Sequence, residues 1–369
     1  MKTDIVVVGS GIAASAAMIR LQQLGLSATQ IAPIEKSSDR IGETLSYTAN
    51  QLLKQLQLWE AFLARGYLAQ DLVFSAWDHP TLTRQSRFSR AQGSTWSIDR
   101  DDFEEFLRMH SANDCHHRLF KKIKTCSQTT DRLILDIDDH PPLQAGFVID
   151  CSGRSAIIGR RLSRRHRIDN MICYYSFIKQ SDTEIEPTVG IMIEAVENGW
   201  WYSAIVPDRR MIISFYTYPD LVHQHLNRDA QAWRSLIDQA PLTQKRIESA
   251  GYCAVEAPLA SDAGMLMQSE SSGRNWITAG DAIATLDPLS SHGMTQALWS
   301  GCKAAEACMN SIHGDQSEIC KFEQTVSQAM QVYQTELITK YQSVQRFARY
   351  PFWERRGSLD FQKNIGARA

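Results

Sequence analysis

Hydrophobic residues follow two different patterns along the chain. Near the N-terminus, apolar runs at residues 4–8 and 29–34 flank a segment of helical periodicity at 12–23, which is typical of an α/β unit with a parallel sheet. Between residues 171 and 260, strand-like runs follow one another, with an earlier hairpin expected within 72–91. This second pattern predicts a mainly antiparallel sheet inserted into the α/β fold.

Helical periodicity returns near residues 229–249, before an expected return strand near 252–258, and a long amphipathic helix is expected in the tail. The predicted fold class is α/β, with a discontinuous Rossmann-like domain, an inserted sheet domain and a C-terminal helical segment. The expected boundaries are 1–75, 96–170 and 255–312 for the nucleotide-binding domain, 76–95 and 171–254 for the substrate-side sheet, and 313–369 for the tail.

Composition narrows the function classes. The 369 residues carry a net charge of −2, so no nucleic-acid partner is expected. The eight cysteines show no Cys-x-x-Cys pair and no zinc-site spacing. We therefore expect no metal site, and we expect the cysteines to be reduced thiols. The N-terminal strand leaves no room for a signal peptide and no apolar run could span a membrane; we therefore expect a cytoplasmic protein.

The first apolar run ends in a glycine turn that leads into a helix. Gly9, Gly11 and Ala14 occupy the three small-residue positions of a dinucleotide-binding turn. Gly9 permits the tight turn, Gly11 lets the backbone approach a pyrophosphate, and Ala14 allows close packing of helix on strand. The amides of Ile12 and Ala13 then face the phosphates at the positive end of the helix dipole. A turn without a nucleotide is the alternative.

The second strand ends at Glu35, 21 residues after Ala14, where the ribose-binding acid of such a fold is expected. We include the adjacent Lys36 in the same predicted site. A surface carboxylate is the alternative for Glu35, and this region does not distinguish NAD from FAD.

Three further segments could surround the rest of a cofactor. Gly42, Glu43 and Thr44 precede a predicted helix at 47–62, although this stretch could also be a simple capping loop. Arg100 stands at a helix start, an unusual place for a cation unless an anion lies nearby; a solvated arginine is the alternative.

The stretch GDAIATLDPLSSHGMTQALWSG begins at Gly280, after an apolar strand. Taken alone, it is a capped loop between a strand and a helix. Together with the segments above, this stretch could also bind a cofactor. The candidate residues are Gly280, Asp281, Pro288, Gly293 and Met294, the last two at the start of the helix.

Together these segments resemble the FAD-dependent monooxygenase superfamily, which includes p-hydroxybenzoate hydroxylase and the flavin-dependent tryptophan halogenases. The resemblance implies that Asp281 accepts a hydrogen bond from the ribityl chain, that the Pro288 loop lies along the flavin, and that the amides at Gly293 and Met294 face its pyrimidine edge. The matching elements, in the order of the family, are Gly9, Gly11, Ala14, Glu35, Gly42–Glu43, Arg100, Asp150–Gly153, Gly280–Asp281, Pro288 and Gly293.

Two features separate the chain from the halogenases within this superfamily. The segment GWWYSAIVP differs from the Gly-Trp-x-Trp-x-Ile-Pro motif, because Tyr202 replaces the second Trp and Pro207 falls two residues late. Halogenases also need a lysine downstream of the Gly-Glu segment, and only Lys54 lies between residues 41 and 98. Halogenation is therefore disfavoured.

The tail and the GWWYSA strand are most similar to flavoproteins required for cysteine tryptophylquinone formation in glycine or lysine oxidases, in particular the glycine oxidase maturation flavoproteins. The resemblance implies an FAD-dependent monooxygenase that uses O₂ to hydroxylate a tryptophan of an oxidase precursor, its protein partner. NAD(P)H, if used, would bind transiently, and a separate reductase is the alternative. A hydroxylase of small aromatic molecules and a non-catalytic FAD-containing chaperone remain alternatives.

Oxygenation of an aromatic ring needs a base for the ring proton. His292, before the predicted flavin helix, and Asp287 are the candidate catalytic residues, although His292 could be an ordinary loop residue and Asp287 an N-cap.

Overall fold

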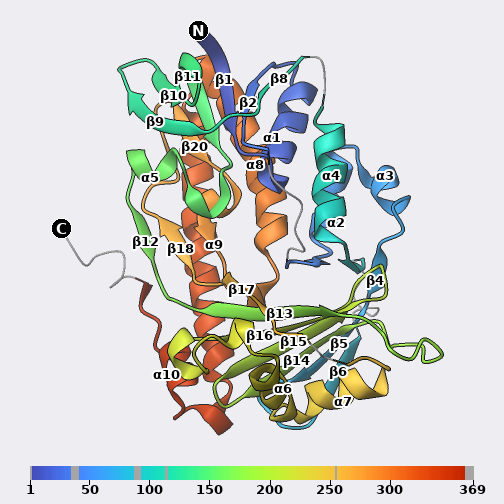
Figure 1. Cartoon of the computed structure of the whole chain (residues 1–369). Helices are drawn as coiled ribbons and strands as arrows, with labels where there is room; N and C mark the ends of the chain where they lie inside the picture. Colours follow the sequence, from blue (N-terminus) through green and yellow to red (C-terminus); the bar gives the residue numbers. More distant parts are fainter. Residues whose placement is uncertain (1, 35–40, 87–92, 113–114, 254–255, 362–369) are drawn as a thin grey trace.

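The computed structural model describes residues 2–34, 41–86, 93–112, 115–253 and 256–361. It forms two lobes, a nucleotide lobe built on a largely parallel sheet and a substrate lobe built on a largely antiparallel one (Figure 1). The predicted α/β fold class is confirmed. Across the described ranges, no helix is long and apolar enough to cross a membrane.

The sheet of the nucleotide lobe has β1 near its centre. Its strands are β1 (Lys2–Val8), β2 (Thr29–Ile31), β8 (His117–Leu119), β9 (Ile123–Gln128), β10 (Leu133–Ile137), β11 (His140–Asp150), β19 (Ser272–Gly273) and β20 (Trp276–Thr278). β1 pairs in parallel with β11 on one side and with β2 on the other. The chain therefore leaves β1 at the same edge at which β11 ends.

Two helices cover one face of this sheet, α1 (Ile12–Gln23) and α8 (Gly293–Ile312) (Figure 1). Ile5 and Val7 of β1 belong to the hydrophobic core beneath them, whereas Val6 and Val8 belong to the core on the opposite face. Burial of both faces explains why β1 is a continuous apolar run rather than an alternating one.

Beside α1 lie three shorter helices, α2 (Ala49–Gln55), α3 (Trp59–Leu63) and α4 (Arg100–His110). The single helix predicted at 47–62 is wrong, because Gln57 adopts a left-handed φ of 60° between α2 and α3. This reversal buries both flanking residues, Leu56 and Leu58. Burial of these two side chains therefore outweighs the helical continuity that the local pattern suggests.

The substrate lobe is built on a seven-stranded sheet. Its strands are β5 (Leu72–Ala76), β6 (Thr83–Ser86), β13 (Ile172–Ile178), β14 (Ile191–Val196), β15 (Gly199–Ile205), β16 (Met211–Thr217) and β17 (Leu259–Asp262). All neighbours pair antiparallel except β14 and β5. The predicted hairpin is β5–β6, but the described part of the expected return strand contributes only a bridge from Tyr252 to Gln180, and β17 begins later.

Helices α6 (Ala230–Asp238) and α7 (Pro241–Ser249) cover the face of this sheet that is turned away from the nucleotide lobe (Figure 1). The remaining strands form two small three-stranded sheets, β3–β7–β4 and β12–β18–β21, and α5 is a short helix. These elements are β3 (Thr44–Leu45), β4 (Leu68–Gln70), β7 (Thr95–Ser97), β12 (Arg165–Arg167), β18 (Leu266–Gln268), β21 (Ala284–Thr285) and α5 (Gly159–Leu162).

The C-terminal helix α9 (Ser317–Gln342) runs along both lobes and is followed by α10 (Pro351–Gly357) (Figure 1). Ile319 and Phe322 near its start pack into the core of the nucleotide lobe. Leu337 and Tyr341 near its end pack into the core of the substrate sheet. The tail is therefore a structural link between the lobes, and not only a cover for the nucleotide domain.

Candidate functional site

A cavity of about 930 Å³ lies where the two lobes meet, at the upper end of the usual range for ligand pockets. Backbone turns of the nucleotide lobe form one end, which we call the nucleotide end. Aromatic side chains of the seven-stranded sheet form the other, which we call the substrate end. Cavity residues used below are Gly9, Gly11, Ile12, Ala13, Gly42, Glu43, Thr44, Arg100, Asp281, Pro288, His292, Gly293 and Met294 from the first lobe and its loops, and Tyr175, Trp200, Tyr202 and Tyr216 from the sheet.

The turn between β1 and α1 brings backbone to the cavity. Gly9 has a φ of 114°, and a Cβ there would lie 2.3 Å from the carbonyl oxygen of Cys151. At Gly11 a Cβ would meet nothing within 4 Å, so its open side faces the cavity. Ile12 and Ala13 also line the cavity, whereas Ala14 is buried in the core beneath α1. Local geometry thus leaves room for a phosphate group at the helix N-terminus.

The predicted ribose-binding residues Glu35 and Lys36 lie outside the described residues. Ala32 and Pro33, which precede them after β2, line the cavity.

Arg100 packs against Gly42 at the cavity wall, where a Cβ on Gly42 would lie 2.4 Å from its Nη1 atom. Its Nε atom donates to Glu104, 2.6 Å away and buried, and Asp99 caps α4 by accepting from the N–H of Asp102. The carboxylate at Glu104 explains how a cation is tolerated at a helix start.

The Gly280 turn places Asp281 at the cavity. Gly280 has a φ of 62°, and its N–H donates to Ser300 in α8 over 2.7 Å. Burial raises the pKa of Asp281, while Arg100 and other nearby cations oppose that rise. No hydrogen bond from the described residues reaches its carboxylate, which is therefore available to accept one from a ligand hydroxyl.

Helix α8 begins at the cavity wall. Gly293 is its first residue, and a Cβ there would meet nothing within 4 Å. Met294 is buried and lines the same wall, as does Pro288 in the preceding loop. A second helix N-terminus thus presents its amides to the cavity, and its first residue, Gly293, has no side chain to keep a ligand away. The open faces of Gly11 and Gly293 and the unbonded carboxylate of Asp281 fit a flavin dinucleotide.

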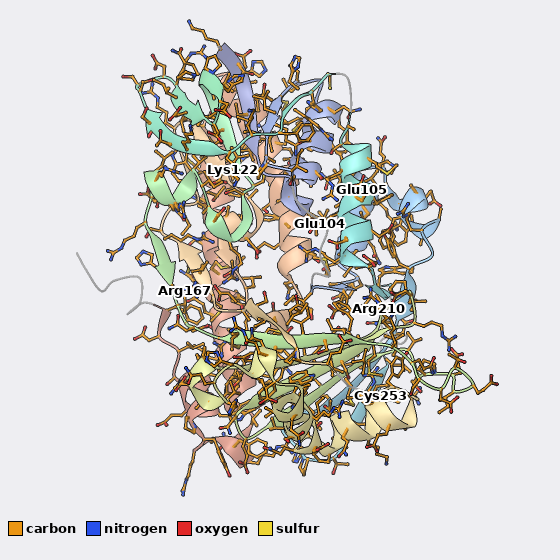
Figure 2. All side chains as sticks on the ribbon, viewed as in Figure 1. Glu104, Glu105, Lys122, Arg167, Arg210 and Cys253 are labelled. Carbon is orange, nitrogen blue, oxygen red and sulfur yellow. The ribbon has the colours of Figure 1, made fainter. Side chains whose placement is uncertain are left out.

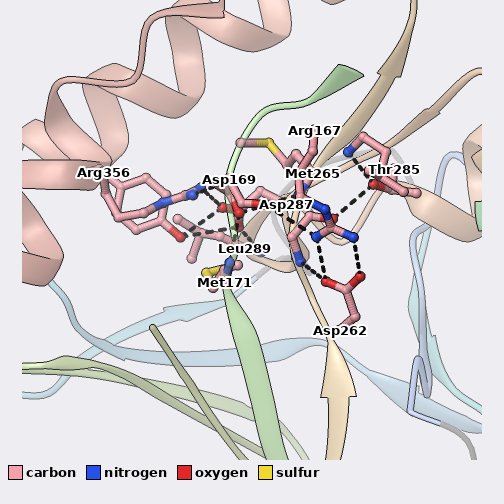
Figure 3. A network of polar contacts seen from close by, with 12 residues as sticks. Arg167, Asp169, Met171, Asp262, Met265, Thr285, Asp287, Leu289 and Arg356 are labelled. Atoms are coloured by element: carbon pink, nitrogen blue, oxygen red, sulfur yellow. Dashed lines mark hydrogen bonds and ion pairs between the residues drawn. The ribbon is translucent and has the colours of Figure 1, made fainter. Parts of the chain in front are cut away.

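Asp287 occupies the centre of a buried ion-pair network (Figure 3). Its carboxylate pairs with Arg356 of α10, and accepts hydrogen bonds from the Leu289 N–H at 2.8 Å and the Tyr341 hydroxyl at 3.0 Å. Arg356 also donates to Asp169 over 2.6 Å. Burial raises the pKa of Asp287 and Arg356 opposes that rise. With its oxygens engaged this way, Asp287 holds the loop before α8 to the tail.

His292 lies at the exposed rim of the cavity, as the N-cap residue of α8. Its side chain makes no capping hydrogen bond, and its carbonyl accepts from the Gln296 N–H at 2.8 Å. The structure therefore places His292 and Asp287 in different environments, one exposed and one enclosed in an ion-pair network.

The substrate end is lined by aromatic rings on one face of the sheet. Trp200 and Tyr202 of β15 point to the cavity side, and Trp200 stacks on Tyr216 with centroids 4.1 Å apart. Trp201 points to the other face, where it packs against Trp233 of α6. The period-two alternation of a strand separates these neighbours. The segment GWWYSA therefore contributes aromatic side chains to both faces of the sheet.

Tyr175 and Tyr216 in this wall, and the Arg356 network behind it, were not predicted as site residues. Trp200 connects the two features, because its indole N–H donates to the Tyr341 hydroxyl over 3.2 Å. Alternation along β13 and β16 could have indicated the two tyrosines. No local signal in the sequence relates Arg356 to a loop 69 residues away.

Lysines line the cavity at the nucleotide end only, as far as the structure describes the chain. Lys121 and Lys122 follow β8 and contribute to its wall. Lys122 lies on the nucleotide lobe, well apart from Arg210 at the substrate sheet (Figure 2). Lys54 is exposed on α2, with its Nζ atom 5.2 Å from the centroid of the Trp59 ring, and is not a cavity residue.

This arrangement of fold and cavity is that of a flavin-dependent oxidoreductase of the halogenase and hydroxylase type. The tryptophan halogenase family model matches residues 68–368, and the chain belongs to this family. Membership implies FAD as the cofactor, in agreement with the fit described above.

Two related proteins carry different descriptions. LodB, a putative FAD-dependent oxidoreductase of Marinomonas mediterranea, is 24% identical over 96% of each chain. A 1H-pyrrole-2-carbonyl peptidyl-carrier-protein brominase of Pseudoalteromonas luteoviolacea is 24% identical over 85% of this chain and 78% of its own.

Solved structures share the fold at low identity. The flavin-dependent halogenase CmlS has a TM-score of 0.84 at 20% identity, over 99% of this chain and 70% of its own. QhpG, a peptidyl tryptophan dihydroxylase essential for tryptophylquinone cofactor biogenesis, has a TM-score of 0.76 at 20% identity, over 96% of this chain and 79% of its own.

Proposed function

We propose that this protein is an FAD-dependent monooxygenase that hydroxylates a tryptophan side chain of a precursor protein during biogenesis of the cysteine tryptophylquinone cofactor of an amino-acid oxidase, with glycine oxidase as the expected partner. The observation that carries the proposal is the substrate end itself. It combines an aromatic wall with the buried carboxyl group of Glu43, which lies where the two ends meet, and among the described residues it has no lysine.

The aromatic wall suits an indole. Trp200 and Tyr216 present stacked rings, and Tyr175 and Tyr202 lie on the same face of the sheet. Flat apolar surfaces of this kind bind an aromatic ring by stacking and exclude water from it. The likeness to QhpG, whose substrate is a peptidyl tryptophan, supports a protein-bound indole over a free one.

When bound, FAD supplies the activation of O₂ that makes one oxygen atom electrophilic. The chain's own residues perform the remaining tasks. The helix N-termini at Ile12 and Gly293 stabilise negative charge on the cofactor, and Asp281 orients it. The Asp287–Arg356 pair holds the loop that carries Pro288 against the cavity. Reducing equivalents come from NAD(P)H or a separate flavin reductase.

Halogenation is the second candidate, because the family model and several relatives are halogenases. In that reaction, a lysine beside the substrate would carry the hypohalous equivalent, as the family resemblance implies. Lys54 is the only lysine between residues 41 and 98, and it lies outside the cavity wall. This placement favours direct oxygen transfer.

The test is a purified reaction of FAD-loaded enzyme, reductant, ¹⁸O₂ and precursor oxidase, with bromide present, followed by mass spectrometry of the precursor tryptophans. We expect a gain of one or two ¹⁸O atoms on one tryptophan. Bromine on the ring would identify a halogenase. Quinone formation that needs the protein but not its reduced flavin would identify a chaperone, and oxygenation of free indole alone would identify a small-aromatic hydroxylase.

A further inference from the structure

Glu43 stands at the junction of the two ends of the cavity. It follows Gly42 in the loop before β3, it is only 6% exposed, and it lines the cavity. One of its carboxylate oxygens accepts a hydrogen bond from the Gly42 N–H at 2.9 Å. Its carboxyl group is thus buried without a cationic partner among the ion pairs of the described residues.

The neighbours of Glu43 belong to the substrate wall. Tyr202 lies beside it, and the Tyr202 hydroxyl is 2.6 Å from the Thr44 hydroxyl. Burial first, and then the negative charge of Glu43, raise the pKa of Tyr202 far above its usual value. Burial, Cys173 and Glu43 do the same for the pKa of Tyr216. Both phenols therefore stay protonated, and the Glu43 carboxyl group lies beside them in the cavity wall.

Asp287 and His292 are less suited to that task. Asp287 is paired with Arg356 and accepts from Tyr341 and Leu289. His292 lies at the exposed rim. Glu43 combines burial, a position in the cavity wall and direct proximity to the aromatic residues that would hold the substrate.

We propose that Glu43 is the catalytic base that accepts the ring proton of the aromatic substrate. The inference rests on the proposed oxygenation. With two electrons from the reductant and two protons from solvent, O₂ is reduced to the peroxide level. A ring carbon gives an electron pair to one oxygen atom, so that the C–O bond forms as the O–O bond breaks. The other oxygen atom keeps the O–O electron pair, takes a proton from solvent and leaves as water. The C–H electron pair returns to the ring, and the proton passes to the Glu43 carboxylate.

Glu43→Gln removes the basic oxygen and retains the shape of the side chain, and Glu43→Asp retains the charge. Glu105→Gln is the matched control, because Glu105 lies on the exposed side of α4 and does not line the cavity (Figure 2). Each variant is compared with wild type for FAD affinity, precursor binding to the oxidised enzyme, and turnover of substrate with a protiated or deuterated indole ring. The wild-type enzyme is first assayed with the labelled precursor and with free indole. The compound that it oxygenates then serves as the substrate for all variants.

For Glu43→Gln we expect FAD and substrate still to bind, and turnover of the FAD-loaded enzyme to fall by about 10²-fold or more. Proton loss then limits the rate, so deuteration slows the Gln variant but not wild type. Glu43→Asp recovers part of the turnover, and Glu105→Gln matches wild type. Unchanged turnover in Glu43→Gln, or slower turnover without an isotope effect or with lost FAD binding, would overturn the assignment. A wild type that oxygenates neither substrate contradicts the proposed function instead.

Discussion

At the nucleotide end of the cavity, glycine turns and helix N-termini form part of the wall, whereas at the substrate end the wall is made of aromatic side chains held by partners far away in the chain. Gly11 and Gly293 present open faces, and each lies at the N-terminus of the helix it begins. Trp200, in contrast, is positioned through Tyr341, Asp287 and Arg356, which come from three other segments. Short sequence motifs therefore predict the cofactor-binding end, whereas the substrate-binding end depends on tertiary packing.

The Arg356 network provides the strongest test of this difference. Arg356→Met leaves Asp169 and Asp287 buried without their shared cation, and such a loss costs about 3–5 kcal/mol. We expect the free energy of unfolding, measured by denaturant titration, to fall by that amount. FAD affinity should fall as well, because the loop that carries Pro288 loses its anchor.

Arg355→Met is the matched control for this variant. Arg355 pairs with Asp220 over 2.6 Å, but both side chains are about half exposed, so its loss costs about 1 kcal/mol or less. Equal destabilisation by the two variants would show that the buried network has no special role in holding the two ends together.

Gly11→Ala tests the nucleotide end with a smaller expected effect. Gly11 has a φ of −80°, which alanine adopts without strain, and the new methyl group meets no protein atom. We expect unchanged or slightly raised stability of the cofactor-free protein. FAD affinity, followed by quenching of flavin fluorescence, should fall by about 10- to 100-fold, which corresponds to about 1.4–2.8 kcal/mol.

The opposite result would remove the distinction between the two ends. If Gly11→Ala lowers the stability of the cofactor-free protein but leaves FAD affinity unchanged, the open face of Gly11 is not a cofactor surface.

The same difference explains what could be predicted from the sequence. The β1–α1 turn, the start of α8 and the antiparallel sheet follow from local patterns, because each depends on neighbouring residues. The break between α2 and α3 was missed because burial of Leu56 and Leu58 outweighs local helical periodicity. In the sequence, Arg356 is one of two adjacent arginines, Arg355 and Arg356. Its partner Asp169 lies 187 residues away, and only the folded chain reveals that Arg356 is buried while Arg355 is exposed.

Asp262 lies at the seam between the two ends and provides the test with the smallest expected effect. It belongs to β17 of the substrate sheet and pairs at 2.8 Å with Arg154 from the nucleotide lobe and with Arg167 of β12. Burial by itself raises the pKa of Asp262, but hydrogen bonds from Arg167 and the Gly264 N–H, with the charge of Arg154, hold it at about 2. This value lies below that of the unfolded chain, about 3.9.

A carboxylate with a lowered pKa stabilises the fold above the unfolded pKa, and that contribution disappears as the pH falls towards the folded pKa. Asp262→Asn should therefore lower the free energy of unfolding at pH 7, by only about 0.5–1 kcal/mol because the pair is partly exposed. The difference from wild type should shrink between about pH 4 and about pH 2. Arg167→Met should lose most of its own effect when it is combined with Asp262→Asn, and additive effects would show that the Arg167–Asp262 ion pair does not stabilise this seam.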